Sequence, residues 1–256
     1  MEINDITFAY QDKITRLHKV NAQLKKGEIT TIIGPNGCGK STLLSVLTNN
    51  NQPQAGQVIL DGKVLNKYKP KELAKKLGVV HQQNTAPADM TVEKLVHYGR
   101  LPHKNTFSPQ SEKDEQMVEW ALKCTGLYER RHDAIDTLSG GQQQRVWIAM
   151  ALAQDTPFLF LDEPTSNLDM YYQYEILELV KQLCEEHGLT IVMVLHDINQ
   201  AIQYSHTIIA MKQGKVIETG NPKEIVTREL IQEVYGVNVV VKDDEDVGMY
   251  IVPLGI

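Results

Sequence analysis

The chain has 256 residues, a formal net charge of −6, and 42% hydrophobic and 23% charged residues. These values are typical of a globular protein with a sizeable core, and the acidic balance gives no electrostatic reason to expect nucleic acid as a partner. The sequence has no apolar run near the roughly 18 residues that span a bilayer, no signal-peptide pattern and only three scattered cysteines, which excludes membrane-spanning and disulfide-scaffold classes.

Local patterns in the first third of the chain predict both strands and helices. Alternating or β-branched stretches predict strands at 1–10, 28–33, 57–60 and 77–81. Residues 41–47 are predicted to open one helix, and a second, short helix is predicted over 70–76. Asp61 with Gly62 predicts a tight turn.

Helical periodicity replaces the strand patterns between 83 and 136. Helices are predicted over 92–99 and 111–125, with Ser111 as an N-cap. Strands then return, because the continuous apolar runs 158–161 and 190–195 are typical of strands buried on both faces. The remaining predictions are helices over 170–187 and 197–204, a hairpin over 207–219, and two short strands around an acidic turn at 242–246. Strands that alternate with helices predict an α/β fold with a mostly parallel sheet.

A glycine-rich loop stands between the predicted strand 28–33 and the helix that begins at 41. It reads Gly34, Pro35, Asn36, Gly37, Cys38, Gly39, Lys40, Ser41 and Thr42. Glycines let backbone N–H groups turn toward phosphate oxygens, and the helix N-terminus adds a partial positive charge. Lys40 would reach the β- and γ-phosphates and Ser41 would ligate Mg²⁺. The alternative is a glycine turn that happens to contain a lysine, and the flanking strand and helix favour nucleotide binding.

Two acidic residues, Asp162 and Glu163, follow the apolar run 158–161. Successive strand residues point in opposite directions, so the two carboxylates can serve different tasks. Asp162 would hold Mg²⁺ through a water, and Glu163 would polarise a water for in-line attack on the γ-phosphate. Taken alone, the pair is equally consistent with two surface acids at a strand end.

A second candidate anion site precedes the helix predicted over 143–154. It consists of Ser139, Gly140, Gly141 and Gln142. On its own this stretch is more simply a glycine-rich helix cap. Two phosphate-binding segments that are far apart in one chain, however, cannot both bind the same γ-phosphate from one side. They can do so if one segment comes from a second copy of the chain. The pair therefore indicates a symmetric dimer in which each copy completes the other's site.

These motifs, in this order and spacing, resemble the ATP-binding-cassette (ABC) ATPases over essentially the whole chain. The resemblance implies a P-loop NTPase core with a mostly parallel sheet, an N-terminal antiparallel β portion and an inserted helical subdomain. The expected organisation is a single ABC ATPase domain over 1–256. Its nucleotide-binding core would cover 1–82 and 156–256, and its helical subdomain, with the signature motif, would cover 83–155.

The resemblance implies roles for residues whose own signals are weak. Tyr10 matches the aromatic residue that stacks on adenine. Gln82 matches the Q-loop glutamine, which contacts Mg²⁺ and senses the γ-phosphate. Many relatives have proline where His81 stands, and Gln83 is the neighbouring candidate for the same role.

Three further positions match the family. Residues 166–169, which end at Asp169, match the D-loop that crosses the dimer interface and contacts the nucleotide site. His196 matches the switch histidine that contacts the γ-phosphate. Cys38 replaces the serine or alanine that is frequent in the P-loop, and a thiol near a helix N-terminus favours a reactive thiolate. The hypothesis is an ATPase sensitive to alkylation, with ATP protecting.

The segment 90–102 resembles that of iron-chelate importer ATPases, which serve siderophore, haem and cobalamin uptake. The expected function is therefore the ATP-hydrolysing subunit of a membrane importer, with a ferric siderophore as the favoured cargo. Its expected partners are ATP and Mg²⁺, a second copy of the chain, permease subunits that dock on 83–102, and through them a substrate-binding protein. It would lie at the cytoplasmic face of the membrane and bind no nucleic acid. The alternatives are an ABC importer ATPase for a metal ion or amino acid, or a non-transport ABC ATPase.

Overall fold

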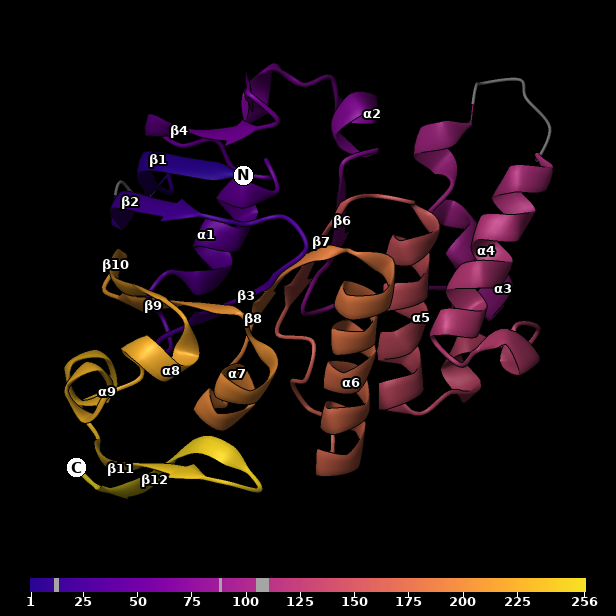
Figure 1. Cartoon of the computed structure of the whole chain (residues 1–256). Coiled ribbons are helices and arrows are strands. Elements are labelled where there is room, and N and C mark those ends of the chain that lie inside the picture. The colour runs from indigo at the N-terminus through magenta and orange to yellow at the C-terminus, as the bar shows by residue number, and fades with distance from the viewer. Residues whose placement is uncertain (12–13, 88, 105–110) are drawn as a thin grey trace. The chain divides into compact units, whose positions relative to one another are not determined.

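The computed structural model describes residues 1–11, 14–87, 89–104 and 111–256. The chain forms two compact units, Met1–Tyr68 with Thr190–Ile256 and Lys69–Leu189 (Figure 1). Ala88 and residues 105–110, which belong to the predicted helical insertion, lie outside the described residues. The domain boundaries near 82 and 155 stay a prediction. Within the described part of the chain, each helix is too short or too polar to cross a membrane.

The first unit contains an antiparallel sheet with the strand order β2-β1-β4-β5. Its strands are β1 (Glu2–Ala9), β2 (Thr15–Gln23), β4 (Ala55–Leu60) and β5 (Lys63–Val64). Asp61 and Gly62 join the last two strands with φ angles of 48° and 75°, as a two-residue hairpin turn requires. The N-terminal antiparallel portion expected from the sequence is confirmed.

A parallel set of strands forms the core of the first unit. β3 (Ile29–Ile33) lies between β8 (Thr190–Val194) and β9 (Thr207–Lys212), and β10 (Lys215–Gly220) runs antiparallel to β9. Every residue of β3 and β8 is buried, which agrees with the β-branched stretch 28–33 and the apolar run 190–195 in the sequence. Helices α1 (Lys40–Leu47) and α7 (Ile198–Tyr204) follow β3 and β8. The loops after β3 and β8 therefore open at the same edge of the sheet.

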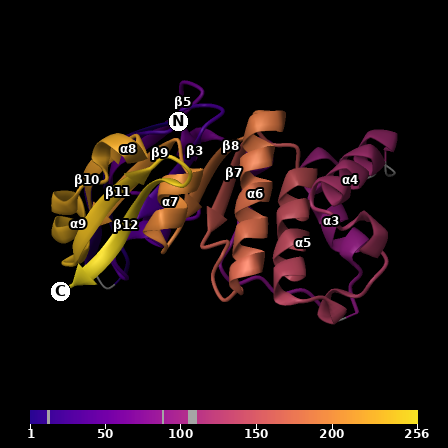
Figure 2. The same ribbon diagram turned by 60° about the horizontal axis from the view of Figure 1, so that its bottom comes forward.

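The C-terminal segment of the first unit ends in a hairpin. Two helices, α8 (Pro222–Ile225) and α9 (Arg228–Tyr235), precede β11 (Asn238–Asp244) and β12 (Gly248–Gly255). The hairpin packs on α7 and α9 (Figure 2). The Asn199 amide donates to the Ile251 carbonyl at 3.2 Å and accepts from the Ile251 N–H at 2.8 Å. These bonds fix the hairpin to α7. The two strands predicted here are confirmed, but β11 continues to Asp244, so the turn is shorter than the predicted 242–246.

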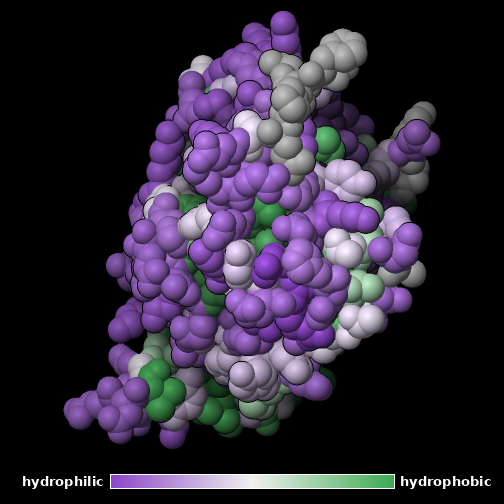
Figure 3. All heavy atoms as spheres, turned by 90° about the vertical axis from the view of Figure 1, so that its right-hand side faces the viewer, coloured by the Kyte–Doolittle hydropathy of each residue, from purple (hydrophilic) through white to green (hydrophobic). Residues whose placement is uncertain are grey.

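The second unit combines two parallel strands with helices. Its elements are α2 (Pro70–Leu73), β6 (Leu77–Val80), α3 (Val92–Tyr98), α4 (Glu112–Cys124), α5 (Gly140–Ala153), β7 (Phe158–Asp162) and α6 (Met170–His187). Helices α3, α4 and α5 pack against one another, as Figure 1 shows. The side that carries α3 and α4 is mostly hydrophilic (Figure 3). Short 3-10 turns lie at Leu101–His103, Tyr128–Arg130 and Ile135–Thr137 in this unit, and at Leu65–Lys67 in the first unit.

Arg100, which follows α3, links helices α3, α4 and α5 through buried polar contacts. The side chain is only 1% exposed, and its Nε lies 2.8 Å from Oδ1 of Asp114 at the start of α4. Its Nη1 donates to the Ala153 carbonyl at the end of α5, at 2.6 Å. Burial alone would raise the pKa of Asp114, but hydrogen bonds from Arg100 and Ser111 together with the Arg100 charge lower it to about 2.

We expect Arg100→Met to lower the free energy of unfolding by about 3 kcal/mol, because it leaves a buried carboxylate without its partner. Urea unfolding measures this loss. Lys123→Met is the matched control, since the Lys123–Glu119 pair on α4 is about half exposed and should contribute little to stability. Equal losses in both variants would contradict the assignment.

The Arg100 contribution should also depend on pH. The pKa of Asp114 lies at about 2 in the folded chain and near 3.8 when unperturbed. The contribution is therefore complete above about pH 5 and is lost as the pH falls through about 2. The difference in unfolding free energy between the parent and Arg100→Met should stay constant from pH 7 to about 5 and shrink at lower pH.

Candidate functional site

The glycine-rich loop adopts a conformation that requires glycine. Gly34, Gly37 and Gly39 have φ angles of 150°, 76° and 110°, in the region that side chains disfavour. A Cβ at Gly34 would lie 2.2 Å from the Met211 carbonyl oxygen, so a side chain does not fit there. The loop therefore wraps closely between β3 and α1, as the sequence predicts.

Lys40 is the first residue of α1 and is folded over this loop. Its side chain is 5% exposed, and its Nζ donates to the carbonyl oxygens of Gly34 at 2.8 Å and Pro35 at 3.2 Å. A buried ammonium group needs such acceptors to offset its desolvation. Ser41 follows on the exposed side of the same turn. A fixed cation beside a helix N-terminus is the chemistry that binds phosphate.

Tyr10 lies beside this phosphate loop. It directly follows β1, and its hydroxyl is 3.4 Å from the Thr42 Oγ1. Tyr10 is 43% exposed as a residue, and its ring packs edge-on against Phe8, with the ring centroids 4.9 Å apart. An accessible aromatic face next to the loop is what stacking on a base requires. His196 is also exposed and directly follows Leu195, just beyond the end of β8.

The environment of Cys38 argues against the reactive thiolate expected from the sequence. The residue is 4% exposed. Burial raises the pKa of its thiol above the ordinary value, and the nearby Lys40 charge offsets that effect only in part. The thiol is therefore neutral near pH 7 and shielded, so the hypothesis of an alkylation-sensitive P-loop loses its physical basis.

In the second unit, Gln82 and Glu163 meet at the carboxyl ends of two parallel strands. β6 ends at Val80 and β7 at Asp162, which places the residues that follow them at one edge. The Gln82 Nε2 donates to Glu163 Oε2 at 2.5 Å. Glu163 has a φ of 52°, a strained value for a residue with a side chain. Such strain is found where the surrounding structure holds a side chain in a required place.

The oxygen donors of the predicted metal ligands fit Mg²⁺. Because Nε2 of Gln82 is bound to Glu163, the amide oxygen of Gln82 is the atom left to accept or ligate. Asp162 offers a carboxylate and Ser41 a hydroxyl, and hard cations prefer oxygen ligands. The described residues form no cluster of three His, Cys, Asp or Glu side chains suited to a metal.

The second anion cradle is a helix N-terminus with a complete capping box. Ser139 Oγ accepts from the Gln142 N–H at 3.4 Å, and the Gln142 Oε1 accepts from the Ser139 N–H at 3.0 Å. Helix α5 begins at Gly140, three residues earlier than predicted. A Cβ at Gly141 would lie 2.7 Å from the Tyr172 ring, so glycine here permits close packing of α5 on α6. Asp169 is exposed and stands at the N-cap position of α6.

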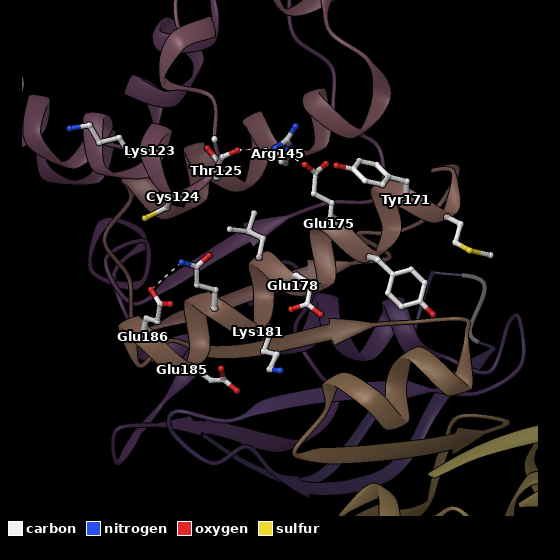
Figure 4. A pocket seen from close by; sticks show the side chains of 15 residues that line it. Lys123, Cys124, Thr125, Arg145, Tyr171, Glu175, Glu178, Lys181, Glu185 and Glu186 are labelled. Carbon is white, nitrogen blue, oxygen red and sulfur yellow. Dashed lines mark hydrogen bonds and ion pairs between the residues drawn. The ribbon is translucent and has the colours of Figure 1, made fainter. Parts of the chain in front are cut away.

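The grooves formed by the described residues of the second unit include two of contrasting character. One, of roughly 330 Å³, contains mostly amide side chains and is lined by Gln82, Gln83, Asn84, Thr85, Gly140, Gln143, Gln144 and Trp147. It joins the residues after β6 to the first turns of α5. The other, of roughly 1040 Å³, follows the outer face of α6 (Figure 4). There Arg145 pairs with Glu175 at 3.1 Å, and none of the predicted motif residues is among the described residues that line it.

Comparison with known proteins agrees with these motifs. The family model described as ABC transporter matches residues 17–166. The ferric enterobactin transport ATP-binding protein FepC of Escherichia coli (strain K12) is 45% identical over 98% of this chain and 92% of its own length. The iron(3+)-hydroxamate import ATP-binding protein FhuC of Bacillus subtilis (strain 168) is 43% identical over 95% of this chain and 90% of its own length.

Solved structures with the same fold include transporters and isolated cassettes. A metal-chelate type ABC transporter in an inward-facing conformation has a TM-score of 0.85 at 28% identity, over 99% of this chain and 96% of that chain. The dimeric structure of the bacterial ABC transporter cassette MJ0796 has a TM-score of 0.75 at 35% identity, over 86% and 98% of the two chains.

Proposed function

The chain belongs to the ABC transporter family and is an ATPase of that family, and we propose that it drives a membrane importer for an iron chelate, most specifically a ferric siderophore. The importer would consist of two copies of this chain, separate permease subunits and a substrate-binding protein. The chain would lie peripherally at the cytoplasmic face of the membrane. The observation that carries the proposal is a complete set of nucleotide motifs in a chain similar along its length to iron-siderophore import ATP-binding proteins.

Nucleotide binding would begin at the phosphate loop. The backbone N–H groups of Gly34 to Thr42 and the Lys40 ammonium bind the phosphates, while the Tyr10 ring stacks on adenine. Bound Mg²⁺, held by Ser41, Gln82 and, through water, Asp162, would neutralise charge on the β- and γ-phosphates. The preformed glycine conformation and the buried Lys40 support this assignment, because the loop needs little reorganisation to receive an anion.

A second copy would complete the site. Ser139, Gly140, Gly141 and Gln142 of one copy would close over the γ-phosphate held by the other, with the Asp169 loop at the interface. Glu163 then accepts a proton from the attacking water, and His196 contacts the γ-phosphate. Hydrolysis would reopen the dimer, which couples the ATPase cycle to the permease.

The permease would dock on the segment from Gln83 to Pro102. The amide-lined groove supports this proposal, because one wall carries Gln82 and the other carries the first turns of the signature helix α5. A segment seated there touches both the γ-phosphate sensor and the closing motif. Movement of the dimer would therefore reach the permease directly.

Reconstitution tests the proposed function. The chain is co-purified with its permease and reconstituted into proteoliposomes. Uptake of ⁵⁵Fe-labelled ferric siderophore is then measured with and without ATP. We expect ATP-dependent uptake in the parent and none with Glu163→Gln. Uptake of manganese or an amino acid in place of the chelate would instead support the alternative importer, and co-purification with ribosomes or DNA would support the non-transport alternative.

A further inference from the structure

Arg130 contacts the signature motif although it lies outside it. Its Nη1 donates to the Gln142 Oε1 at 2.7 Å, and its Nε donates to the Asp133 Oδ2 at 2.7 Å. Both bonds are short, as expected when a donor or acceptor is charged. The planar guanidinium therefore joins the 3-10 turn Tyr128–Arg130 to the first turn of α5.

The bond from Arg130 decides which way the Gln142 amide faces. The Gln142 Oε1 accepts from both the Ser139 N–H and Arg130, so two donors converge on the same atom. The amide oxygen is thus directed into the cap, and the two N–H groups on Nε2 point away from it. This orientation keeps the capping box closed and leaves donors, which suit an oxyanion ligand.

The capping box in turn fixes the serine of the signature. Since Ser139 Oγ accepts from the Gln142 N–H, its lone pair is used by the helix and its proton can be donated to a ligand. The first intrahelical hydrogen bond runs from the Gln143 N–H to the Ser139 carbonyl, at 2.8 Å. The N–H groups of Gly140 and Gly141 precede it and take no part in the hydrogen bonds of the helix. All donors of the cradle therefore depend on the geometry at Ser139 and Gln142.

We propose that Arg130, held by Asp133, is a positioning residue that orients Gln142 and Ser139 so that they can clamp the nucleotide of a second copy. The inference rests on the proposed dimeric site. Arg130 acts through Gln142, because two of its nitrogens are engaged by Gln142 and Asp133 and its charge is balanced by the Asp133 carboxylate.

Arg130→Met in a Glu163→Gln background tests this role through ATP-dependent dimerisation, measured by light scattering. We expect the ATP concentration for half-maximal dimerisation to rise about tenfold, the effect of losing one hydrogen bond to a charged donor. Binding of a fluorescent ATP analogue to the monomer should stay within about twofold of the parent, because that site is the chain's own P-loop. Arg130→Lys should recover part of the loss, since an ammonium can hold one of the two partners.

Arg131→Met is the matched control. Arg131 is the next residue in the chain, but its side chain contacts Tyr128. Its Nη1 donates to the Tyr128 carbonyl at 2.8 Å, and its guanidinium lies over the Tyr128 ring. Its loss should leave dimerisation unchanged. In a Gln142→Ala background, Arg130→Met should add less than about a twofold further shift, because its effect passes through Gln142. An unshifted Arg130→Met, or an equal shift in both backgrounds, would overturn the proposal.

Failure of the Glu163→Gln parent to dimerise at saturating ATP would count against the proposed function. A second measurement tests the inference even then, because amide hydrogen exchange of the nucleotide-free monomer reports on the helix cap at Ser139 and Gln142. Exchange at Gln142 should rise about tenfold in Arg130→Met and stay at the parental rate in Arg131→Met. Equal exchange in the parent and Arg130→Met would refute the positioning role.

Discussion

Glu163→Gln is expected to lower the rate of ATP hydrolysis by at least about 100-fold while ATP binding persists, because the amide cannot accept the proton of the attacking water. The substitution is nearly isosteric. The amide oxygen of the new side chain can still accept the hydrogen bond from Gln82, so the strained backbone at position 163 keeps its support. The protein should therefore accumulate as an ATP-bound dimer. Phosphate release and light scattering measure the two effects.

Glu185→Gln provides the control for charge and side-chain size. Glu185 is an exposed residue of α6, away from the end of β7. The Glu185→Gln variant should hydrolyse ATP at the parental rate and should not accumulate as a dimer. Parental hydrolysis by Glu163→Gln would remove Glu163 from its proposed role.

Lys40→Ala is expected to weaken ATP binding itself, by about 100-fold, since it removes a charged donor from a site shielded from water. The ammonium is already held by the carbonyls of Gly34 and Pro35, so little entropy is lost when phosphate arrives. Binding of ATP to the purified monomer, measured by calorimetry, reports the change. Unlike Glu163→Gln, this variant should not dimerise at ATP concentrations that saturate the parent.

Two further variants separate binding from folding. Lys25→Ala removes an exposed lysine near β3 and should leave ATP affinity unchanged. Lys40→Met keeps most of the buried volume, so its unfolding midpoint should stay close to the parent while its ATP affinity falls like that of Lys40→Ala. Unchanged affinity in both Lys40 variants would contradict the assignment of the phosphate loop.

The parallel core and its loops could be predicted from the sequence because local pattern and tertiary environment agree there. β3, β7 and β8 are largely buried, and each is marked in the sequence by a β-branched or apolar stretch. Helix α6 covers the residues predicted for it, Met170–His187. The orientation of Gln82 toward Glu163 could not be predicted, since it depends on two parallel strands ending side by side.

Strand β2 shows where pattern reasoning fails. Leu17 and Val20 are its buried apolar positions, and their spacing of three departs from the alternation of a regular strand. Lys19 has a φ of 48°, and the register with β1 shifts between Ile6 and Phe8. This irregularity inserts an extra residue and hides the strand from a search for period two.

Two other features were missed for different reasons. Helix α9 buries Leu230, Ile231 and Val234, a helical spacing that is present in the sequence and could have been recognised. Arg130 carried no local signal, because a surface arginine in a short turn is ordinary. Its contact with Gln142 arises only when the 3-10 turn folds against the start of α5.

The central claim is that each ATP site is built from the phosphate loop of one copy and the signature of the other. Mixing two inactive variants, Lys40→Ala and Ser139→Arg, tests it most directly. A mixed dimer contains one intact site, from the loop of the Ser139→Arg copy and the signature of the Lys40→Ala copy. Random pairing should therefore restore roughly a quarter of the parental hydrolysis rate. A mixture as inactive as each variant alone would contradict the shared site.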